Sequence, residues 1–167
     1  ANWRADQNEL KFLKDKNVLS DRETITSFVY ARPDFLEVDV FPHIKDVKGF
    51  YFAGGEPLMH TEHYEILKYL DENKMYDKSI IYSTNMTTLK WKSIDFLEIW
   101  KNFNNIQFIC SIDGYQEGLE YIRNKSKNDV IFGNLRKLID FKKANLDKNF
   151  SISICYTHSI YNAYYTR

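Results

Sequence analysis

Four short runs rich in Ile, Val, Tyr and Phe occur along the chain, and each has the composition and length of a buried β-strand. They are GFYFA (49–53), SIIYST (79–84), IQFICSI (106–112) and FSISICYT (150–157). The first three begin roughly 30 residues apart, which is the size of a strand–helix–strand unit. Because nearly continuous apolar runs are typical of parallel strands covered on both faces, the pattern predicts a parallel sheet.

Between these runs the apolar positions recur every three or four residues, as on one face of a helix. The three segments concerned are 63–74, 93–103 and 130–144. Strands and helices therefore alternate, which is typical of the α/β class. The alternation does not choose between an open, doubly wound sheet and a β/α barrel, because both repeat the same right-handed crossover unit. In both, ligands bind at the carboxyl ends of the strands.

The first third of the chain has a weaker pattern. Residues 2–16 are predicted to be helical, Ser20 and Glu23 have the spacing of a capping box, and two prolines bound a short helix further on. We therefore expect a mainly helical covering segment over 1–48 ahead of the βα units of 49–167, within a single domain.

Composition and charge exclude several classes of function. The chain has 167 residues, 44% of them hydrophobic, and its 23 basic residues balance 23 acidic ones. This balance argues against a polyanionic partner such as nucleic acid or an anionic membrane surface. No apolar run approaches the roughly 20 residues that cross a bilayer, and the polar N-terminus lacks the apolar stretch of a signal peptide, so we expect a cytoplasmic protein.

Polar residues cluster directly after each predicted strand. Gly54-Gly55-Glu56-Pro57 follows the first strand, Thr84-Asn85 ends the second, Ser111 to Gly114 end the third, and Thr157-His158 end the fourth. Since the carboxyl ends of parallel strands meet at one edge of the sheet, we expect these four loops to form one polar rim.

The GGEP loop is the most informative of the four. Glycine permits positive φ and close approach to the main chain, while Pro57 fixes its own φ and keeps the loop shaped. Glu56 supplies an acceptor, which suits a cation such as an ammonium and not a phosphate. The phosphate-binding patterns GxGxxG and GxxxxGK are both absent. A tight turn with a solvated glutamate explains the tetrapeptide alone equally well.

Other chemically interesting residues carry weaker signals. Arg123, in EYIR, could return to the rim and grip a carboxylate bidentately, although such an arginine is more often a surface ion-pair residue. His60 and His63 have helical i, i+3 spacing, but no third ligand is placed to complete a metal site. Cys110 and Cys155 lie in strand-like runs without CxxC spacing, so we interpret them as small buried hydrophobes.

Four motifs, YFAGGEPL, STN, SIDG and EYIR, occur in that order and at these intervals, and together they resemble the radical SAM superfamily. The closest likeness is to the twitch or SPASM-type branch, and it covers nearly the whole chain. The resemblance implies an incomplete, TIM-like parallel β/α barrel. It also implies a [4Fe–4S] cluster held by a CxxxCxxC loop, and reductive cleavage of S-adenosylmethionine (SAM) to a 5′-deoxyadenosyl radical.

The resemblance also implies a set of cofactor-binding residues. The GGEP loop would bond the methionyl ammonium of SAM, the serine of SIDG and the arginine of EYIR would meet its carboxylate, and the asparagine of STN would lie near the ribose. These residues are Gly54, Gly55, Glu56, Pro57, Asn85, Ser111 and Arg123. No catalytic residue and no metal ligand is assigned within the chain.

The sequence departs from the family pattern at one important point, because CxxxCxxC is absent. The chain also starts with Ala and ends in an interrupted segment, so we expect a fragment whose cluster ligands lie outside it and which is inactive alone. The resemblance implies SAM, a peptide or protein substrate, and an electron donor such as flavodoxin or ferredoxin as partners. Two alternatives stay open: a degenerate, non-catalytic binding module with the same fold, and an unrelated α/β-barrel enzyme whose rim binds phosphate.

Overall fold

The structure is a computed structural model that describes residues 33–123 and 125–163. The chain divides into two units, Ala1–Asp46 and Val47–Arg167. The helix expected over 2–16 and the capping box expected further on lie outside the described residues. None of the described helices is long and apolar enough to span a membrane.

The described part of the first unit contains two short helical turns. A π-helix, η3, spans Leu36–Val40, and a 3-10 helix, η4, spans Phe41–His43 with a proline in its first turn. Proline is tolerated there because the first amides of a helix have no intrahelical acceptor. The short helix expected beside the prolines is therefore present, in two tightly joined pieces.

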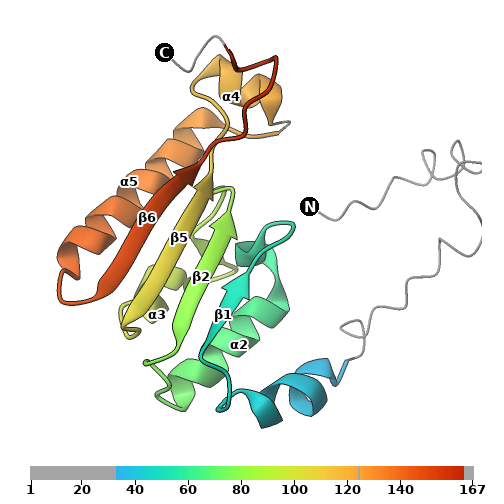
Figure 1. Cartoon of the computed structure of the whole chain (residues 1–167), viewed down its shortest axis with the longest axis vertical. Coiled ribbons are helices and arrows are strands. Elements are labelled where there is room, and N and C mark those ends of the chain that lie inside the picture. Colours follow the sequence, from blue (N-terminus) through green and yellow to red (C-terminus); the bar gives the residue numbers. More distant parts are fainter. Residues whose placement is uncertain (1–32, 124, 164–167) are drawn as a thin grey trace, which may run out of the picture. The chain divides into compact units, whose positions relative to one another are not determined.

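The second unit alternates strands and helices (Figure 1). In chain order they are β1 (Gly49–Phe52), η5 (Pro57–Met59), α2 (Thr61–Glu72), β2 (Ser79–Thr84), β3 (Lys90–Trp91), β4 (Ile94–Asp95), α3 (Phe96–Trp100), β5 (Asn105–Ser111), α4 (Glu117–Ile122), α5 (Asn128–Ala144) and β6 (Asn149–Cys155). The four predicted strands and three predicted helices are confirmed. The β3–β4 hairpin replaces the start of the second predicted helix (93–103), and α4 was not predicted as a separate helix.

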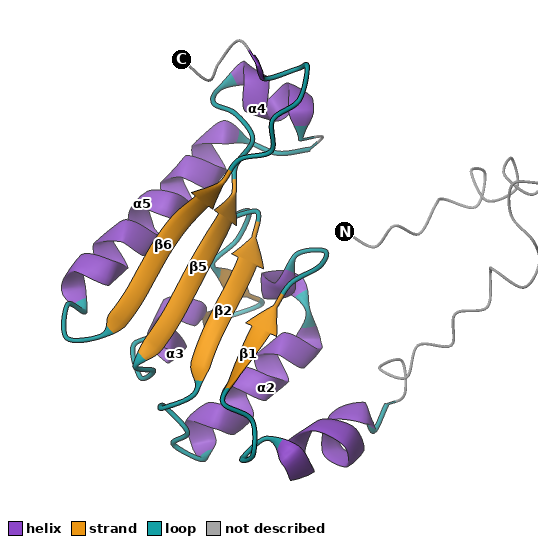
Figure 2. Cartoon of the chain, in the orientation of Figure 1, coloured by secondary structure: helices purple, strands orange, loops and turns teal. Residues whose placement is uncertain are grey.

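The four long strands form one parallel sheet in the order β1-β2-β5-β6. Strands that follow one another in the chain are neighbours, so every crossover advances in the same direction and the helices lie on one side, as Figure 2 shows. A doubly wound sheet reverses its strand order and places helices on both faces. The described sheet therefore winds like part of a β/α barrel, and it does not close.

The two faces of this sheet differ in composition. On the helix-covered face, the rings of Phe52, Tyr82 and Phe108 stack across three neighbouring strands, with centroids 5.4 and 5.6 Å apart. On the opposite face, Tyr51 of β1 is 62% exposed, and Gln107 of β5, in the same row with Ile81 between them, is exposed as well. The expectation that the strands are covered on both faces was wrong for the described part of the chain, where the helices of this unit cover one face.

A buried polar group joins the two helices nearest β2. The hydroxyl of Tyr82 accepts a hydrogen bond from Trp100 Nε1 (3.0 Å) and makes another with His63 Nε2 (2.8 Å). Burial lowers the pKa of His63 to about 3, with a smaller contribution from nearby His60. His63 is thus a neutral core residue. Among the described residues no group of three or more His, Cys, Asp or Glu side chains is placed to hold a metal ion.

The depressed pKa of His63 predicts that acid destabilises the fold. An unfolded histidine binds a proton below about pH 6.5, whereas folded His63 stays neutral down to about pH 3. The unfolded state therefore binds more protons in this window, and the free energy of unfolding should fall by up to about 1.4 kcal/mol per pH unit on acidification. Urea unfolding between pH 7 and pH 4 measures this slope.

The slope is assigned to His63 by comparison with His63→Phe, which should remove it. His43→Gln, at an exposed histidine, is the control and should keep the slope. The comparison is needed because other groups titrate in the same range. Equal slopes for the wild type and His63→Phe would contradict the assignment.

Candidate functional site

The GGEP loop leaves the carboxyl end of β1 in a backbone conformation that favours glycine. Gly54 has φ +83° and Gly55 has φ +51°, so both lie in the left-handed region. A Cβ built on Gly54 would meet no atom within 4 Å, which shows that the main chain there faces open space. Pro57 then begins η5 and is buried. The main chain at Gly54 is therefore open to close approach, and the loop has the positive φ values that its glycines permit.

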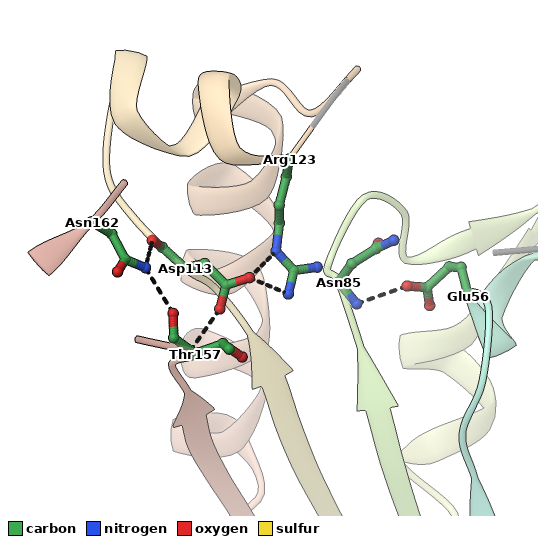
Figure 3. Close-up of polar contacts among 6 residues, drawn as sticks. All are labelled: Glu56, Asn85, Asp113, Arg123, Thr157 and Asn162. Carbon is green, nitrogen blue, oxygen red and sulfur yellow. Dashed lines mark hydrogen bonds and ion pairs between the residues drawn. The ribbon is translucent and has the colours of Figure 1, made fainter. Parts of the chain in front are cut away.

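The Glu56 side chain lies differently from the sequence expectation. It is only 6% exposed, and its carboxylate accepts three hydrogen bonds. The donors are Leu58 N (3.2 Å) and Thr84 Oγ1 (2.7 Å) to Oε1, and Asn85 N (2.7 Å) to Oε2. Figure 3 shows the contact with Asn85. Glu56 thus fastens the loop after β1 to the end of β2, with most of its acceptor capacity used inside the protein.

These contacts have opposing effects on the Glu56 carboxyl group. Burial raises its pKa, while the hydrogen bonds from Asn85, Thr84 and Leu58 lower it and offset the burial only in part. A carboxylate that has lost hydration in this way gains from a positive charge placed near it. The site therefore favours a cation beside the GGEP loop.

The turn after β2 is held by its own side chains. Thr84 Oγ1 accepts from Met86 N (3.1 Å), and Asn85 Oδ1 accepts from Thr87 N (3.0 Å) and Thr87 Oγ1 (2.7 Å). Asn134 of α5 donates to Met86 O at 2.8 Å. The side-chain amide nitrogen of Asn85 makes no hydrogen bond within the described part of the chain, so it is available to a ligand.

A second polar group lies at the ends of β5 and β6. Arg123 donates through Nε and Nη2 to Asp113 Oδ2, both at 2.7 Å, and Thr157 N donates to Asp113 Oδ1 at 2.8 Å. Asn162 Nδ2 donates to the backbone oxygens of Asp113 (3.0 Å) and Thr157 (2.7 Å). Figure 3 shows these residues together at the rim. The arginine expected to grip a carboxylate therefore grips one that belongs to this chain.

Six of the seven predicted site residues lie at three strand ends, and Arg123 directly follows α4. Only some of the seven touch each other. Glu56 and Asn85 are hydrogen-bonded, and Arg123 reaches the rim through Asp113. Ser111 ends β5 half-buried, and its hydroxyl bonds to none of the described residues. Asp113 could have been identified from the sequence, because it directly follows a predicted strand. No sequence pattern points to Asn162.

An open hollow of about 550 Å³ lies elsewhere, beside α4 and the start of α5. Its lining residues are Tyr115, Gln116, Glu117, Gly118, Glu120, Asn128 and Asp129, and none of them is a predicted site residue. Glu120 accepts hydrogen bonds there from Asn128 N (3.0 Å) and Lys127 Nζ (3.4 Å). The hollow therefore does not mark the rim site.

The cysteines do not form a cluster site. The sequence contains two, Cys110 and Cys155, whereas a [4Fe–4S] cluster needs at least three thiolates from a motif such as CxxxCxxC. Cys110 is buried, and burial together with the negative charge of Glu56 raises the pKa of its thiol to about 12. Cys155 is exposed, contrary to the expectation that both are buried. The residues present therefore do not fit an iron–sulfur cluster.

Comparison with known proteins gives one match. The family model described as Radical SAM superfamily matches residues 36–156, which include all seven predicted site residues. No curated protein and no solved structure matches the chain.

The contacts of Glu56 predict that its charge stabilises the rim. In Glu56→Gln the amide nitrogen would face the donor Asn85 N, leaving that N–H without an acceptor. The free energy of unfolding at pH 7 should fall by about 1–3 kcal/mol in urea titrations. The exposed Glu65 on α2 provides the matched control, since Glu65→Gln should change it by no more than about 0.5 kcal/mol. Equal effects of the two substitutions would show that the three hydrogen bonds do not stabilise the fold.

Proposed function

This chain belongs to the radical SAM superfamily, and we propose that it forms the part of such an enzyme that binds the methionyl end of S-adenosylmethionine. The [4Fe–4S] cluster is then held by cysteines outside these 167 residues. Reductive cleavage of SAM to a 5′-deoxyadenosyl radical is the reaction of the superfamily, and in this proposal it belongs to the assembled protein.

The observation that carries the proposal is the conformation of the GGEP loop. Two adjacent left-handed glycines, one of them facing open space, lie at the carboxyl end of a parallel strand. Ligands of α/β sheets bind at this edge. Bare carbonyl oxygens next to a buried carboxylate suit an ammonium group, so the methionyl amino group of SAM is the fitting ligand.

The buried position of Glu56 refines its role in this proposal. Its three internal hydrogen bonds use most of its lone pairs, so the direct contacts to the ammonium come mainly from the backbone of Gly54 and Gly55. Glu56 acts by holding the loop against β2 and by supplying negative charge at close range. A bound ammonium would in turn lower the pKa that burial raises.

The other rim residues fit the remaining polar groups of SAM. Arg123 has donors left after pairing with Asp113, and Ser111 has a hydroxyl group that bonds to none of the described residues, so the two suit the methionyl carboxylate. The amide nitrogen of Asn85 suits a ribose hydroxyl. Pro57 keeps the loop in shape by starting η5.

We extend the proposal to the twitch or SPASM-type branch of the superfamily, on the order of the motifs YFAGGEPL, STN, SIDG and EYIR. On that basis a peptide or protein is the expected substrate, and flavodoxin or ferredoxin the expected electron donor. The polar, exposed residues on the open face of the sheet, such as Gln107 and Ser151, are compatible with a polar substrate.

Substitution of Gly54 tests the loop assignment. Alanine at φ +83° is strained by roughly 1–2 kcal/mol, and its methyl group would stand where the ligand approaches, so Gly54→Ala should weaken SAM binding roughly tenfold. Gly133→Ala on α5 is the matched control, since a Cβ there also meets no atom within 4 Å but φ is not positive. Isothermal titration calorimetry measures both affinities. Unchanged affinity in Gly54→Ala, or tighter binding of inorganic pyrophosphate than of SAM, would contradict the proposal.

The protein with its flanking coding sequence tests the cluster assignment. If a flank carries CxxxCxxC, protein purified without oxygen should show iron–sulfur absorbance and release 5′-deoxyadenosine from SAM, and replacing the three cysteines with serine should abolish both. Absence of both signals with intact cysteines would instead favour the non-catalytic binding module.

A further inference from the structure

The Arg123 side chain is fixed along one edge and open along the other. Its Nε and Nη2 both donate to Asp113 Oδ2 at 2.7 Å, which uses two of the five N–H donors of a guanidinium. The three that remain include both on Nη1, and the Nη1–Nη2 edge has the spacing that receives a carboxylate bidentately. In Figure 3 the outer end of the guanidinium is turned toward the side of the rim where Asn85 lies.

Asp113 is held in place by the main chain as well as by Arg123. Its Oδ1 accepts from Thr157 N at 2.8 Å, and its backbone oxygen accepts from Asn162 Nδ2 at 3.0 Å. The Asp113 side chain is 10% exposed, compared with 26% for Arg123. The carboxylate therefore has a fixed position that does not depend on the arginine.

Asn162 connects the chain after β6 to the end of β5. It is fully buried, its Nδ2 donates to the backbone oxygens of Asp113 and Thr157, and its Oδ1 accepts from Ser159 N at 2.7 Å. These bonds satisfy the whole amide group, which a buried polar side chain requires. Asn162 lies beyond the residues that the family model matches.

We propose that Asp113, anchored by Thr157 and Asn162, is a positioning residue that orients the guanidinium of Arg123 for the carboxylate of an α-amino acid group at the rim. The inference rests on the proposed function, in which that group is the methionyl end of SAM. Asp113 does not touch the ligand itself. It acts by fixing one edge of the guanidinium so that the other edge faces the site.

The physical reason is the conformational freedom of arginine. A long side chain that must be ordered on binding loses rotamer entropy, which weakens the complex. Arg123 is ordered before the ligand arrives, because Asp113 is itself rigid. The opposite view is that Asp113 competes with the ligand for Arg123. The two views predict opposite effects when the Asp113 charge is removed, which makes them separable.

The test compares the dissociation constants of SAM and of decarboxylated SAM, which lacks only the carboxylate, by isothermal titration calorimetry on the full chain. Wild-type protein should prefer SAM by about tenfold or more, as expected for a charge-assisted carboxylate contact. Asp113→Asn should reduce this preference to about threefold or less while affinity for decarboxylated SAM is maintained. Asp140→Asn, which removes a charge from an exposed ion pair on α5, should keep the wild-type preference.

Three other results are possible, and each contradicts either the inference or the proposed function. If Asp113→Asn keeps or increases the preference for SAM, Asp113 is a competitor and the inference is wrong. If wild-type protein binds SAM without preferring it to the decarboxylated form, the inference fails while the ammonium site at the GGEP loop stands. If wild-type protein binds neither compound, the proposed function fails and the inference with it.

A second measurement requires no variant that could misfold. In ligand-free wild-type protein, the Nε–H of Arg123 should exchange with solvent at least about tenfold more slowly than that of the exposed Arg136 on α5, because it is hydrogen-bonded to a fixed carboxylate. Nitrogen-15 NMR resolves the two groups. Equal exchange rates would show that Arg123 is not held in advance and would overturn the inference.

Discussion

Two buried carboxylates hold the rim of this protein together, and each does so by accepting a backbone N–H from the next strand in the sheet. Glu56, after β1, accepts from Asn85 N after β2, and Asp113, after β5, accepts from Thr157 N after β6. Parallel strands share no hairpin that would align their ends, so the exits need a separate connection. A charged acceptor bonded to a main-chain donor is a strong way to make it.

This construction changes which groups can meet a ligand. Most of the acceptor capacity of the two carboxylates is used within the protein. They can therefore act on a ligand more as fixed negative charges than through direct hydrogen bonds. The groups that remain available are the backbone of Gly54 and Gly55, the amide nitrogen of Asn85, the hydroxyl of Ser111 and part of Arg123. They provide acceptors at the β1 end and donors toward β5, which is the arrangement that an amino acid zwitterion requires.

The core beneath the rim also contains a buried polar group whose hydrogen bonds are made within the protein. Tyr82 places a hydroxyl group in an aromatic cluster, and the Trp100 and His63 rings are both hydrogen-bonded to it. His63 Nδ1 is nevertheless buried and has no hydrogen-bond partner in the described part of the chain. A protonated imidazole would bury an unpaired charge there, which explains why the ring stays neutral.

The sequence by itself determined the strands, the three main helices, the α/β class and the position of the polar loops, because hydrophobic period and glycine placement are local properties. The single-sided winding, the hairpin before α3 and the contacts of each rim side chain were decided by the tertiary structure. Glu56 meets Thr84 across 28 residues, and Asp113 meets Thr157 and Asn162 across 44 and 49. No local pattern reveals such pairs, because whether a polar group faces a ligand or another part of the chain depends on which loops the folded sheet brings together.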